Sequence, residues 1–375
     1  MRRVGVAELP LHPGRCPPWL FSRMRRLGGA IAELIVHEYG RHEFLKRIGD
    51  PFFFQALGCT LGFDWHSSGL TTTVCGALKE AMKPGELGIA VCGGKGNVSK
   101  RTRDEIEELS DVFSLSSQTV ESLKYASKMA AKVDNSCVQD GYQLYHHSFI
   151  LTEDGDWAVV QQGMQERLAR RYHWLSDGVH SFVEEPHSGI AADREEQAVL
   201  DMTARESEEA RTVGLDVVRD DPTRLKAYLR GAEQLSIDEY LPSPREMRTL
   251  IMPSRHEILG LCERTMEALR RAYELQPESY EELVAIRGIG PKAVRALALV
   301  SEVVHGASPS WKDPAKFSFA HGGKDGIPYP VDRRTYQKTI GIIESATLAA
   351  RVGDKEKLNA IKRLHDYLGC HQVNE

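Results

Sequence analysis

The first stretch of the chain places apolar residues at helical spacing. One long amphipathic segment begins near Pro17 and ends at Gly40, and two shorter ones cover residues 44–48 and 51–57. Proline at the start of a segment and glycine at its end are typical of helix boundaries. These segments predict a layer of packed helices.

The pattern changes in the middle of the chain. The apolar run at residues 88–92 predicts a buried strand, and helical spacing returns over residues 118–133. Residues 142–152 and 156–162 then form two strand patterns around Asp154-Gly155, which is a strong hairpin signal. The chain therefore combines helices with a small sheet that includes a β-hairpin.

The predicted hairpin concentrates polar side chains at its open end. A two-residue turn at Asp154-Gly155 fixes a register in which His147 faces Gln162. The adjacent His146 points to the opposite face, because side chains alternate along a strand. Burying such imidazoles and amides without partners would cost roughly 1–3 kcal/mol each. They therefore need hydrogen bonds to one another or a ligand.

Residues 186–240 separate the mixed first half from a helical last part. Residues 184–240 carry 7 Lys and Arg against 15 Asp and Glu, whereas residues 241–375 carry 20 against 17. Pro242 and Pro244 open the last part, and amphipathic helical patterns follow them. The sequence predicts an α+β fold in three parts. These are a mixed α/β domain with the small sheet at 1–185, an acidic helical connector at 186–240, and an all-α domain at 241–375.

Two helical patterns within residues 283–306 flank a tight glycine turn. Gly288 can end the first helix with positive φ, and Pro291 suits the first turn of the second. Gly290 lacks a side chain where another backbone must come close, and Lys292 adds a cation to N–H groups that favour an anion. The stretch resembles the helix-hairpin-helix motif, which implies binding of DNA phosphates without reading sequence. An ordinary glycine-capped helical hairpin is the alternative. The residues expected to bind nucleic acid here are Gly288, Ile289, Gly290, Lys292 and Arg295.

A basic and aromatic run follows the predicted β-hairpin, Arg170-Arg171-Tyr172-His173-Trp174. Such interleaving suits nucleic acid, so Arg170 and Arg171 are further candidate contacts. An exposed strand edge with one buried tryptophan is the alternative.

The strand at 88–92 leads into Gly93-Gly94-Lys95-Gly96, with Lys100 shortly after. A strand, a glycine-rich basic loop and a helix together let backbone amides hold a phosphate. The spacing is not that of a Walker loop. Thr102 and Glu105 predict a capping box for the next helix. A flexible loop with solvated cations is the alternative.

A polar segment that contains Asp64 and His66 stands between apolar helices. We expect these two side chains to share a catalytic cleft with Asp140, His147 and Gln162. Histidine suits proton transfer near neutral pH, and with carboxylates it suits binding of Mn or Zn. A divalent metal is therefore the candidate cofactor, although no ligand set is defined. A structural network that satisfies itself is the alternative.

The glycine turn also resembles that of the base-excision DNA glycosylases of the helix-hairpin-helix type. In those enzymes a GxGxK hairpin is followed by a Val-Asp pair at a helix start, and Val331-Asp332 precedes a helical pattern here. The resemblance implies Lys292 as a nucleophile and Asp332 as the residue that assists it.

Composition restricts the class of protein and its cellular compartment. The net charge of −5 excludes a uniformly basic nucleic-acid-binding protein, and the seven cysteines form no CxxC pair. We expect buried free thiols in a reducing compartment. The N-terminal residues lack the apolar region of a signal peptide, and no apolar run approaches the ~20 residues of a membrane span. These features predict a cytoplasmic protein with no membrane partner.

Several longer phrases of the chain are distinctive: ELPLHPG, DPFFFQALGCTLGFDWHSSG, VCGGKG, VQDGYQLYHH, WAVVQQGM and DGIPYPVDR. Through them the chain resembles, over nearly its full length, a family catalogued as domain of unknown function 763, found largely in thermophilic archaea and some bacteria. That resemblance implies no particular activity, so the prediction of function rests on the residues.

Three functions are consistent with these features. The first, which we expect, is a DNA-processing or repair enzyme, a nuclease or a base-excision glycosylase or lyase, whose hairpin holds duplex phosphates. The second is a non-enzymatic DNA- or RNA-binding protein. The third is a nucleotide or small-molecule enzyme in which the hairpin is structural. Salt-sensitive affinity for plain duplex separates the third from the others, and the oligomeric state stays open.

Overall fold

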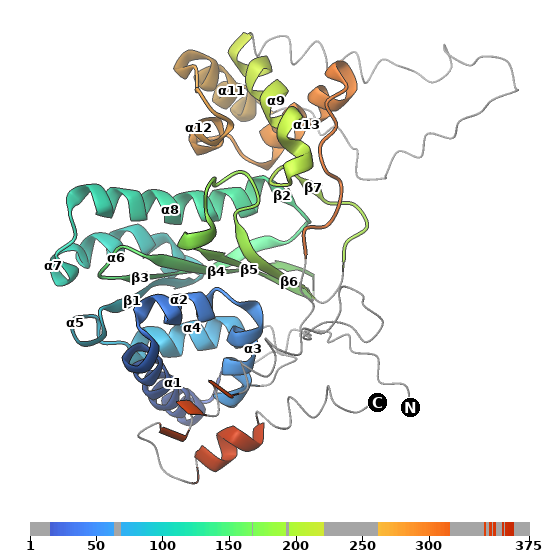
Figure 1. Cartoon of the computed structure of the whole chain (residues 1–375). Helices are drawn as coiled ribbons and strands as arrows, with labels where there is room; N and C mark the ends of the chain where they lie inside the picture. Colours follow the sequence, from blue (N-terminus) through green and yellow to red (C-terminus); the bar gives the residue numbers. More distant parts are fainter. Residues whose placement is uncertain are drawn as a thin grey trace, which may run out of the picture.

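A five-stranded antiparallel sheet lies between two helical layers (Figure 1). The computed structural model describes residues 16–63, 69–166, 168–192, 195–220 and 262–315, with single residues and short runs of 341–363. Asp64, His66 and Asp332 lie outside these residues. Within the part that is described, each helix is too short or too polar to cross a bilayer.

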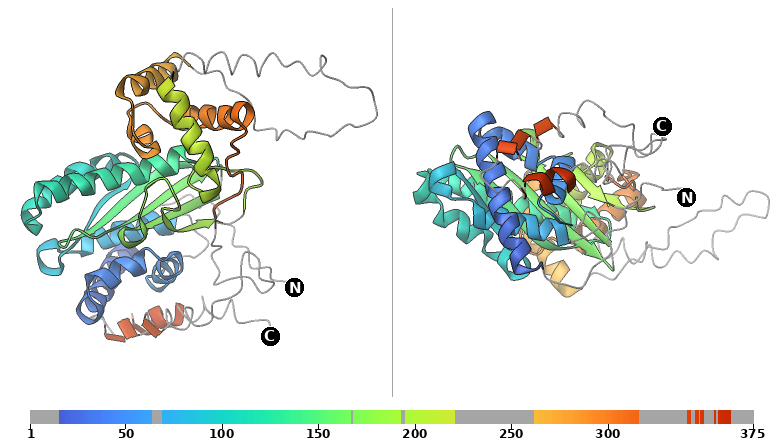
Figure 2. Two further views of the ribbon diagram at one scale, coloured as in Figure 1. Left: turned by 45° about the horizontal axis from the view of Figure 1, so that its top comes forward. Right: turned by 90° about the horizontal axis from the view of Figure 1, so that it is seen from below.

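One face of the sheet is covered by the N-terminal helices. They are α1 (Pro18–Tyr39), α2 (Arg41–Ile48), α3 (Pro51–Thr60) and α4 (Gly69–Ala81), and from below they stand in front of the sheet (Figure 2). Gly40 ends α1 with φ +88°, and the Asp50 carboxylate caps α3 by accepting from the Phe52 amide at 2.8 Å. The predicted helical layer is confirmed.

The sheet has the strand order β1-β3-β4-β5-β6. Its strands are β1 (Ile89–Lys95), β3 (Gln143–Thr152), β4 (Trp157–Gln165), β5 (Leu168–Leu175) and β6 (His187–Ala192). Ala90 and Val159 face a second helical layer formed by α6 (Thr102–Glu108) and α8 (Ser117–Ser136), whereas Val91 and Val160 face the N-terminal helices. Both faces are therefore buried, and the apolar side chains of the sheet divide between these two cores and a third, smaller one around Tyr172 and Ile190.

The β3–β4 hairpin departs from its predicted register by one residue. Thr152 and Asp156 share a backbone hydrogen bond of 2.9 Å, so the loop has three residues and ends at Gly155, which has φ +89°. This is the geometry of a type I turn followed by a glycine bulge, whereas a two-residue turn was predicted. His147 consequently pairs with Gln161, and the predicted pairing with Gln162 is wrong.

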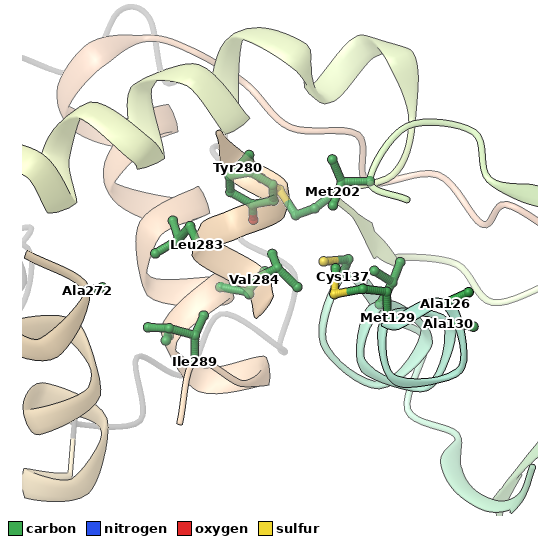
Figure 3. Packing of buried hydrophobic residues seen from close by; sticks show 14 of the residues in the cluster. Ala126, Met129, Ala130, Cys137, Met202, Ala272, Tyr280, Leu283, Val284 and Ile289 are labelled. Carbon is green, nitrogen blue, oxygen red and sulfur yellow. The ribbon is translucent and has the colours of Figure 1, made fainter. Parts of the chain in front are cut away.

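The C-terminal helices pack on the outer side of α8. They are α9 (Glu208–Asp220), α11 (Glu263–Leu275), α12 (Tyr280–Ala285) and α13 (Pro291–His305). Tyr280 and Val284 of α12 lie across from Met129 and Cys137 at the end of α8 (Figure 3). One hydrophobic cluster therefore runs from the sheet through α8 into these helices.

A short second sheet lies between the five-stranded sheet and the C-terminal helices. It pairs β2 (Val138–Gln139) with β7 (Leu200–Asp201). The chain returns to the same place after α13: the Asp201 amide donates to the Ser310 carbonyl at 2.9 Å, and the Val199 amide donates to the Trp311 carbonyl at 3.1 Å. We call this pairing of residues 199–201 with 310–311 the clasp.

The predicted α+β class is confirmed, with a sheet larger than expected. Residues 187–192 form a strand of that sheet, so the prediction of a helical connector is wrong there. The sequence predicts a helical connector because charged residues dominate 186–240, and the apolar run at 190–192 is too short to stand out. The boundary of a separate domain at 241–375 stays a prediction.

Candidate functional site

A chain of buried hydrogen bonds lies between α8 and the sheet. Ser127 Oγ is 2.9 Å from His147 Nε2, and His147 Nδ1 is 2.8 Å from Gln161 Oε1. The amide nitrogen of Gln161 donates to Asp134 at 2.5 Å, and the other oxygen of Asp134 lies 2.6 Å from His187 Nε2. We call these five residues the α8 network.

The direction of the hydrogen bonds in this network follows from Asp134. A carboxylate only accepts, so the Gln161 amide nitrogen faces it and the Gln161 carbonyl oxygen faces His147. Nδ1 of His147 then carries the hydrogen, and Nε2 accepts from the Ser127 hydroxyl. Burial lowers the pKa of His147 below its ordinary value of 6.5, although the Gln161 hydrogen bond opposes that shift. The imidazole is therefore neutral at pH 7, the form that this pattern requires.

Asp134 is the centre of the network and His187 is its outermost member. Asp134 also accepts from the indole N–H of Trp174 at 3.1 Å, so two donors share one of its oxygens. The His187 ring packs edge-on against Trp174, with centroids 4.8 Å apart. The Asp134 side chain is fully buried, whereas that of His187 retains 8% exposure. An imidazole oriented by a carboxylate is the arrangement used in general acid–base catalysis.

A second buried cluster lies beside this network. Arg170 donates to both oxygens of Asp313, at 2.8 and 2.7 Å, and to Asp140 at 3.1 Å. The Tyr172 hydroxyl donates to Asp140 at 2.6 Å, and the Tyr142 ring lies 4.7 Å from the guanidinium carbon of Arg170. Burial raises the pKa of Asp140 to about 6, against the opposing effect of Arg170. The bidentate contact joins residue 313, beyond α13, to the centre of the sheet.

The turn between α12 and α13 lies partly at the surface. Gly288 has φ +101°, Ile289 is buried as an anchor, and Lys292 is exposed. Lys132 of α8 donates to the Ile286 carbonyl. Burial, with the nearby Lys128 as the next cause, lowers the pKa of Lys132 to about 8.

The family comparison covers both clusters and the turn. A family model described as "Protein of unknown function (DUF763)" matches residues 5–331. The chain belongs to this family. The description names no activity or ligand, so the resemblance of residues 283–306 to helix-hairpin-helix motifs stays a prediction. No curated protein and no solved structure matches the chain.

The DUF763 fold separates the residues that were predicted to share one cleft. Asp140 and His147 lie on the α8 side of the sheet but in different clusters. Gln162 lies on the opposite side and donates to the Tyr145 hydroxyl. A cleft that joins His147 to Gln162 is therefore wrong. Its remaining members, Asp64 and His66, fall outside the described residues.

The basic and aromatic run is buried on both faces of the sheet. Arg170 is fully buried and Arg171 is 2% exposed. Arg171 donates to Gln55 at 3.1 Å and to Thr71 at 3.3 Å, under the N-terminal helices. The prediction that these arginines contact nucleic acid at the surface is wrong, because a two-sided sheet buries the strand that carries them.

The predicted phosphate loop is largely strand. Gly93, Gly94 and Lys95 continue β1, and Gly96 and Lys100 belong to the 3-10 turn that follows. The Gly93 amide donates to the Glu105 carboxylate at 2.7 Å, which occupies a donor that a phosphate would need. The predicted capping box is also wrong: the Thr102 hydroxyl donates to the Ser99 carbonyl, and Glu105 instead holds Gly93 and Lys79. Phosphate binding at Lys95 and Lys100, which are exposed, stays a prediction.

The structure reveals functional candidates that the sequence reasoning missed. The predicted helix stops at residue 133, one residue before Asp134, but α8 continues to Ser136. Ala126, Ala130, Val133 and Asp134 all lie on the buried side of α8. A carboxylate on the apolar side of a helix implies a buried partner, and this signal was available. His187 carried no comparable signal, since its partner is 53 residues away in the sequence.

Proposed function

We propose that this DUF763 protein binds DNA through backbone phosphates at the turn between α12 and α13. The main support for this proposal is that the N-terminus of α13 is uncapped and has Lys and Arg side chains close to it. Gly290 is the N-cap and no described side chain caps it. Arg287 and Lys292 are exposed beside it, and Lys132 reaches the same turn from α8. We call these residues, with Lys128 one helical turn away, the α13 surface.

The chemistry of this surface suits a phosphate. Uncapped N–H groups at a helix start favour an anion, and nearby Lys and Arg add sequence-independent attraction to a nucleic-acid backbone. Burial is the main cause of the lowered pKa of Lys132, and repulsion by Lys128 adds to it. A bound phosphate would relieve that repulsion. Of the two acidic residues of α12, Glu281 accepts from the Tyr125 hydroxyl at 2.9 Å and Glu282 accepts from the Glu278 amide at 2.8 Å.

Substitution of Gly290 tests the proposal directly. A Cβ at Gly290 would meet only the Gly288 carbonyl, at 4.0 Å, and its φ of −138° suits any residue. Gly290→Asp should therefore stay folded while its carboxylate occupies the phosphate position. We expect it to lose most affinity for labelled duplex in fluorescence anisotropy.

Salt dependence supplies the second measurement. Lys292→Glu should weaken binding for all duplex sequences and lower the salt slope by about one unit. Lys46→Glu, an exposed lysine of α2 across the sheet, is the matched control and should bind as wild type does. Equal affinity of wild type, Gly290→Asp and Lys292→Glu for duplex at fixed salt would show that the α13 surface does not bind DNA. Absence of duplex affinity in all three proteins would favour a nucleotide or small-molecule enzyme instead.

A second candidate function, DNA processing, rests on the α8 network. His187 is oriented by Asp134 and is the least buried of the five residues, which suits it to move a proton for a hydrolytic reaction. Labelled damaged, branched and intact DNA, with and without magnesium, would reveal turnover on denaturing gels. His187→Ala should lose at least ~100-fold in that rate.

A glycosylase or lyase reaction would use Lys292 instead. Lys292 is exposed on the first turn of α13, which lacks the burial that activates Schiff-base lysines. Borohydride trapping of a covalent adduct on Lys292 would nevertheless establish it. Absence of any turnover alongside retained duplex affinity would leave a non-enzymatic DNA-binding protein.

A further inference from the structure

Three side chains that suit a metal ion meet at the turn end of the β3–β4 hairpin. His42 comes from α2, Asp156 from the hairpin loop, and Asp177 from the 3-10 turn after β5. His42 Nε2 is 2.8 Å from an oxygen of Asp177, and His42 Nδ1 is 3.5 Å from an oxygen of Asp156. Among the described residues, this is the group whose ligand atoms all lie within 4.8 Å of one another.

The positions of the two carboxylates are fixed by the hairpin loop. The glycine bulge at Gly155 directs the chain back, and the Asp156 amide donates to the Thr152 hydroxyl at 3.2 Å. The Trp157 amide donates to the Ser176 hydroxyl at 3.1 Å, which holds Asp177 beside Asp156. These contacts keep two like charges close together before any ion arrives.

The third proposed ligand, His42, is positioned by its neighbour Arg41, which forms ion pairs with the hairpin loop. Arg41 binds Glu153 and lies 3.4 Å from Asp154, which ties the start of α2 to the same loop. Arg41 thereby neutralises the other carboxylates of the loop but not Asp156 or Asp177. The described residues supply no Lys or Arg ion pair to either of these two. Among the residues that the structure describes, His42 is thus the ion-pair partner of both carboxylates.

We propose that His42, Asp156 and Asp177 bind a divalent first-row metal ion of the Zn²⁺ or Mn²⁺ class. One imidazole nitrogen with carboxylate oxygens is a ligand set that these ions accept, whereas Mg²⁺ and Ca²⁺ favour oxygen alone. With bonds of about 2.1 Å, ligands on opposite sides of such an ion stand about 4 Å apart. The three ligand atoms already lie within 4.8 Å of one another, which is a range that one such ion can span.

The site has room for an external ligand. All three side chains are between 41% and 50% exposed, so water reaches the ion. Three protein ligands leave at least one coordination position open, as in sites where a metal ion binds or activates an added group. This site lies on other elements than the α13 surface and does not depend on DNA binding.

Calorimetric titration of the full chain with Zn²⁺ or Mn²⁺ alone tests the site. Wild type should show one saturable site, and His42→Ala and Asp177→Asn should each weaken it by at least about tenfold. His37→Ala is the matched control, because His37 is an exposed histidine with a single carboxylate neighbour, Glu33, at 3.9 Å. It should bind as wild type does.

The isosteric Asp177→Asn variant keeps the test decisive if His42→Ala fails to fold. Its melting temperature without metal should equal that of wild type, and added metal should raise the wild-type value alone. Absence of saturable binding up to about 1 mM, the weak end of specific sites, would overturn the proposal. Equal affinity of Asp177→Asn and wild type would overturn it too.

Discussion

At the scale of single residues, burial decides the chemistry of the candidate site. Burial disfavours the charged form of the Asp140 carboxyl group more strongly than the nearby Arg170 favours it. Its pKa rises from 3.8 to about 6, so the folded protein holds a proton that the unfolded chain has already released. Stability from this group is therefore present at low pH and is lost as pH rises through about 6.

The pH dependence of an Asp140→Asn variant measures this effect. The stability advantage of wild type over the variant should shrink by about 3 kcal/mol between about pH 4 and pH 7. Urea denaturation of both proteins at each pH gives the difference, because other groups cancel. A difference that stays constant, or grows with pH, would show that Arg170 outweighs burial.

Residue-scale sequence reasoning found two members of the clusters and missed their partners. His147 and Asp140 were predicted as functional from their polar surroundings, and both are buried in polar networks. Gln161, Asp134 and His187 were missed. Hydrogen-bond partners across a sheet depend on register, and a shift of one residue moves every side chain to the other face.

At the scale of elements, the two glycines of the α12–α13 turn have different roles. Gly288 has φ +101°, and a Cβ there would lie 2.8 Å from the Ala268 Cβ of α11. Gly290 has extended backbone with open space beside it. Gly288 therefore sets the geometry of the turn, whereas the small size of Gly290 leaves the helix N-terminus accessible.

Alanine substitutions separate these roles. Gly288→Ala should lower the free energy of unfolding by about 1–3 kcal/mol, because it adds backbone strain and a clash. Gly290→Ala should change it by less than about 0.5 kcal/mol. Thermal and urea unfolding of both variants would check the pair, and equal destabilisation would contradict the distinction.

Most elements were predictable, and the exception at residues 93–95 depends on a neighbouring strand. The helices near residues 18–60, α8, β1 and the hairpin strands follow the hydrophobic period of the sequence. Residues 93–95 were predicted as loop because glycines dominate them, yet pairing with β3 extends the strand. Only glycine fits at 93, where a Cβ would lie 2.3 Å from the His147 carbonyl oxygen. That reason lies in the neighbouring strand, which local propensity does not report.

At the scale of the whole molecule, Arg170 and Asp313 join the chain beyond α13 to the sheet. Both side chains are nearly inaccessible, at 0% and 3% exposure. Asp313 also accepts from the Glu196 amide at 2.6 Å, so it connects three segments. A buried pair of this kind is costly to break from one side, because the remaining charge stays buried.

Removal of the carboxylate should therefore loosen the junction. Asp313→Ala is expected to lower the free energy of unfolding by about 3 kcal/mol or more. Lys312→Ala, an exposed neighbour, should change it by less than about 0.5 kcal/mol. Denaturant titration followed by tryptophan fluorescence measures both. A wild-type value for Asp313→Ala would show that hydrophobic packing alone holds the junction.

The clasp between residues 199–201 and 310–311 also has a consequence for the order in which the protein folds and opens. Everything from Met202 to Pro309 lies between its two ends, so the clasp closes a very long loop. Closing that loop costs entropy before its few hydrogen bonds form, whereas the hydrogen bonds within each of the helices α9 and α11–α13 are local in sequence. Refolding should thus assemble the helices early and seal the clasp late. In the native protein the same bonds open first, and the amide of Asp201 should exchange its hydrogen faster than those of the central strands.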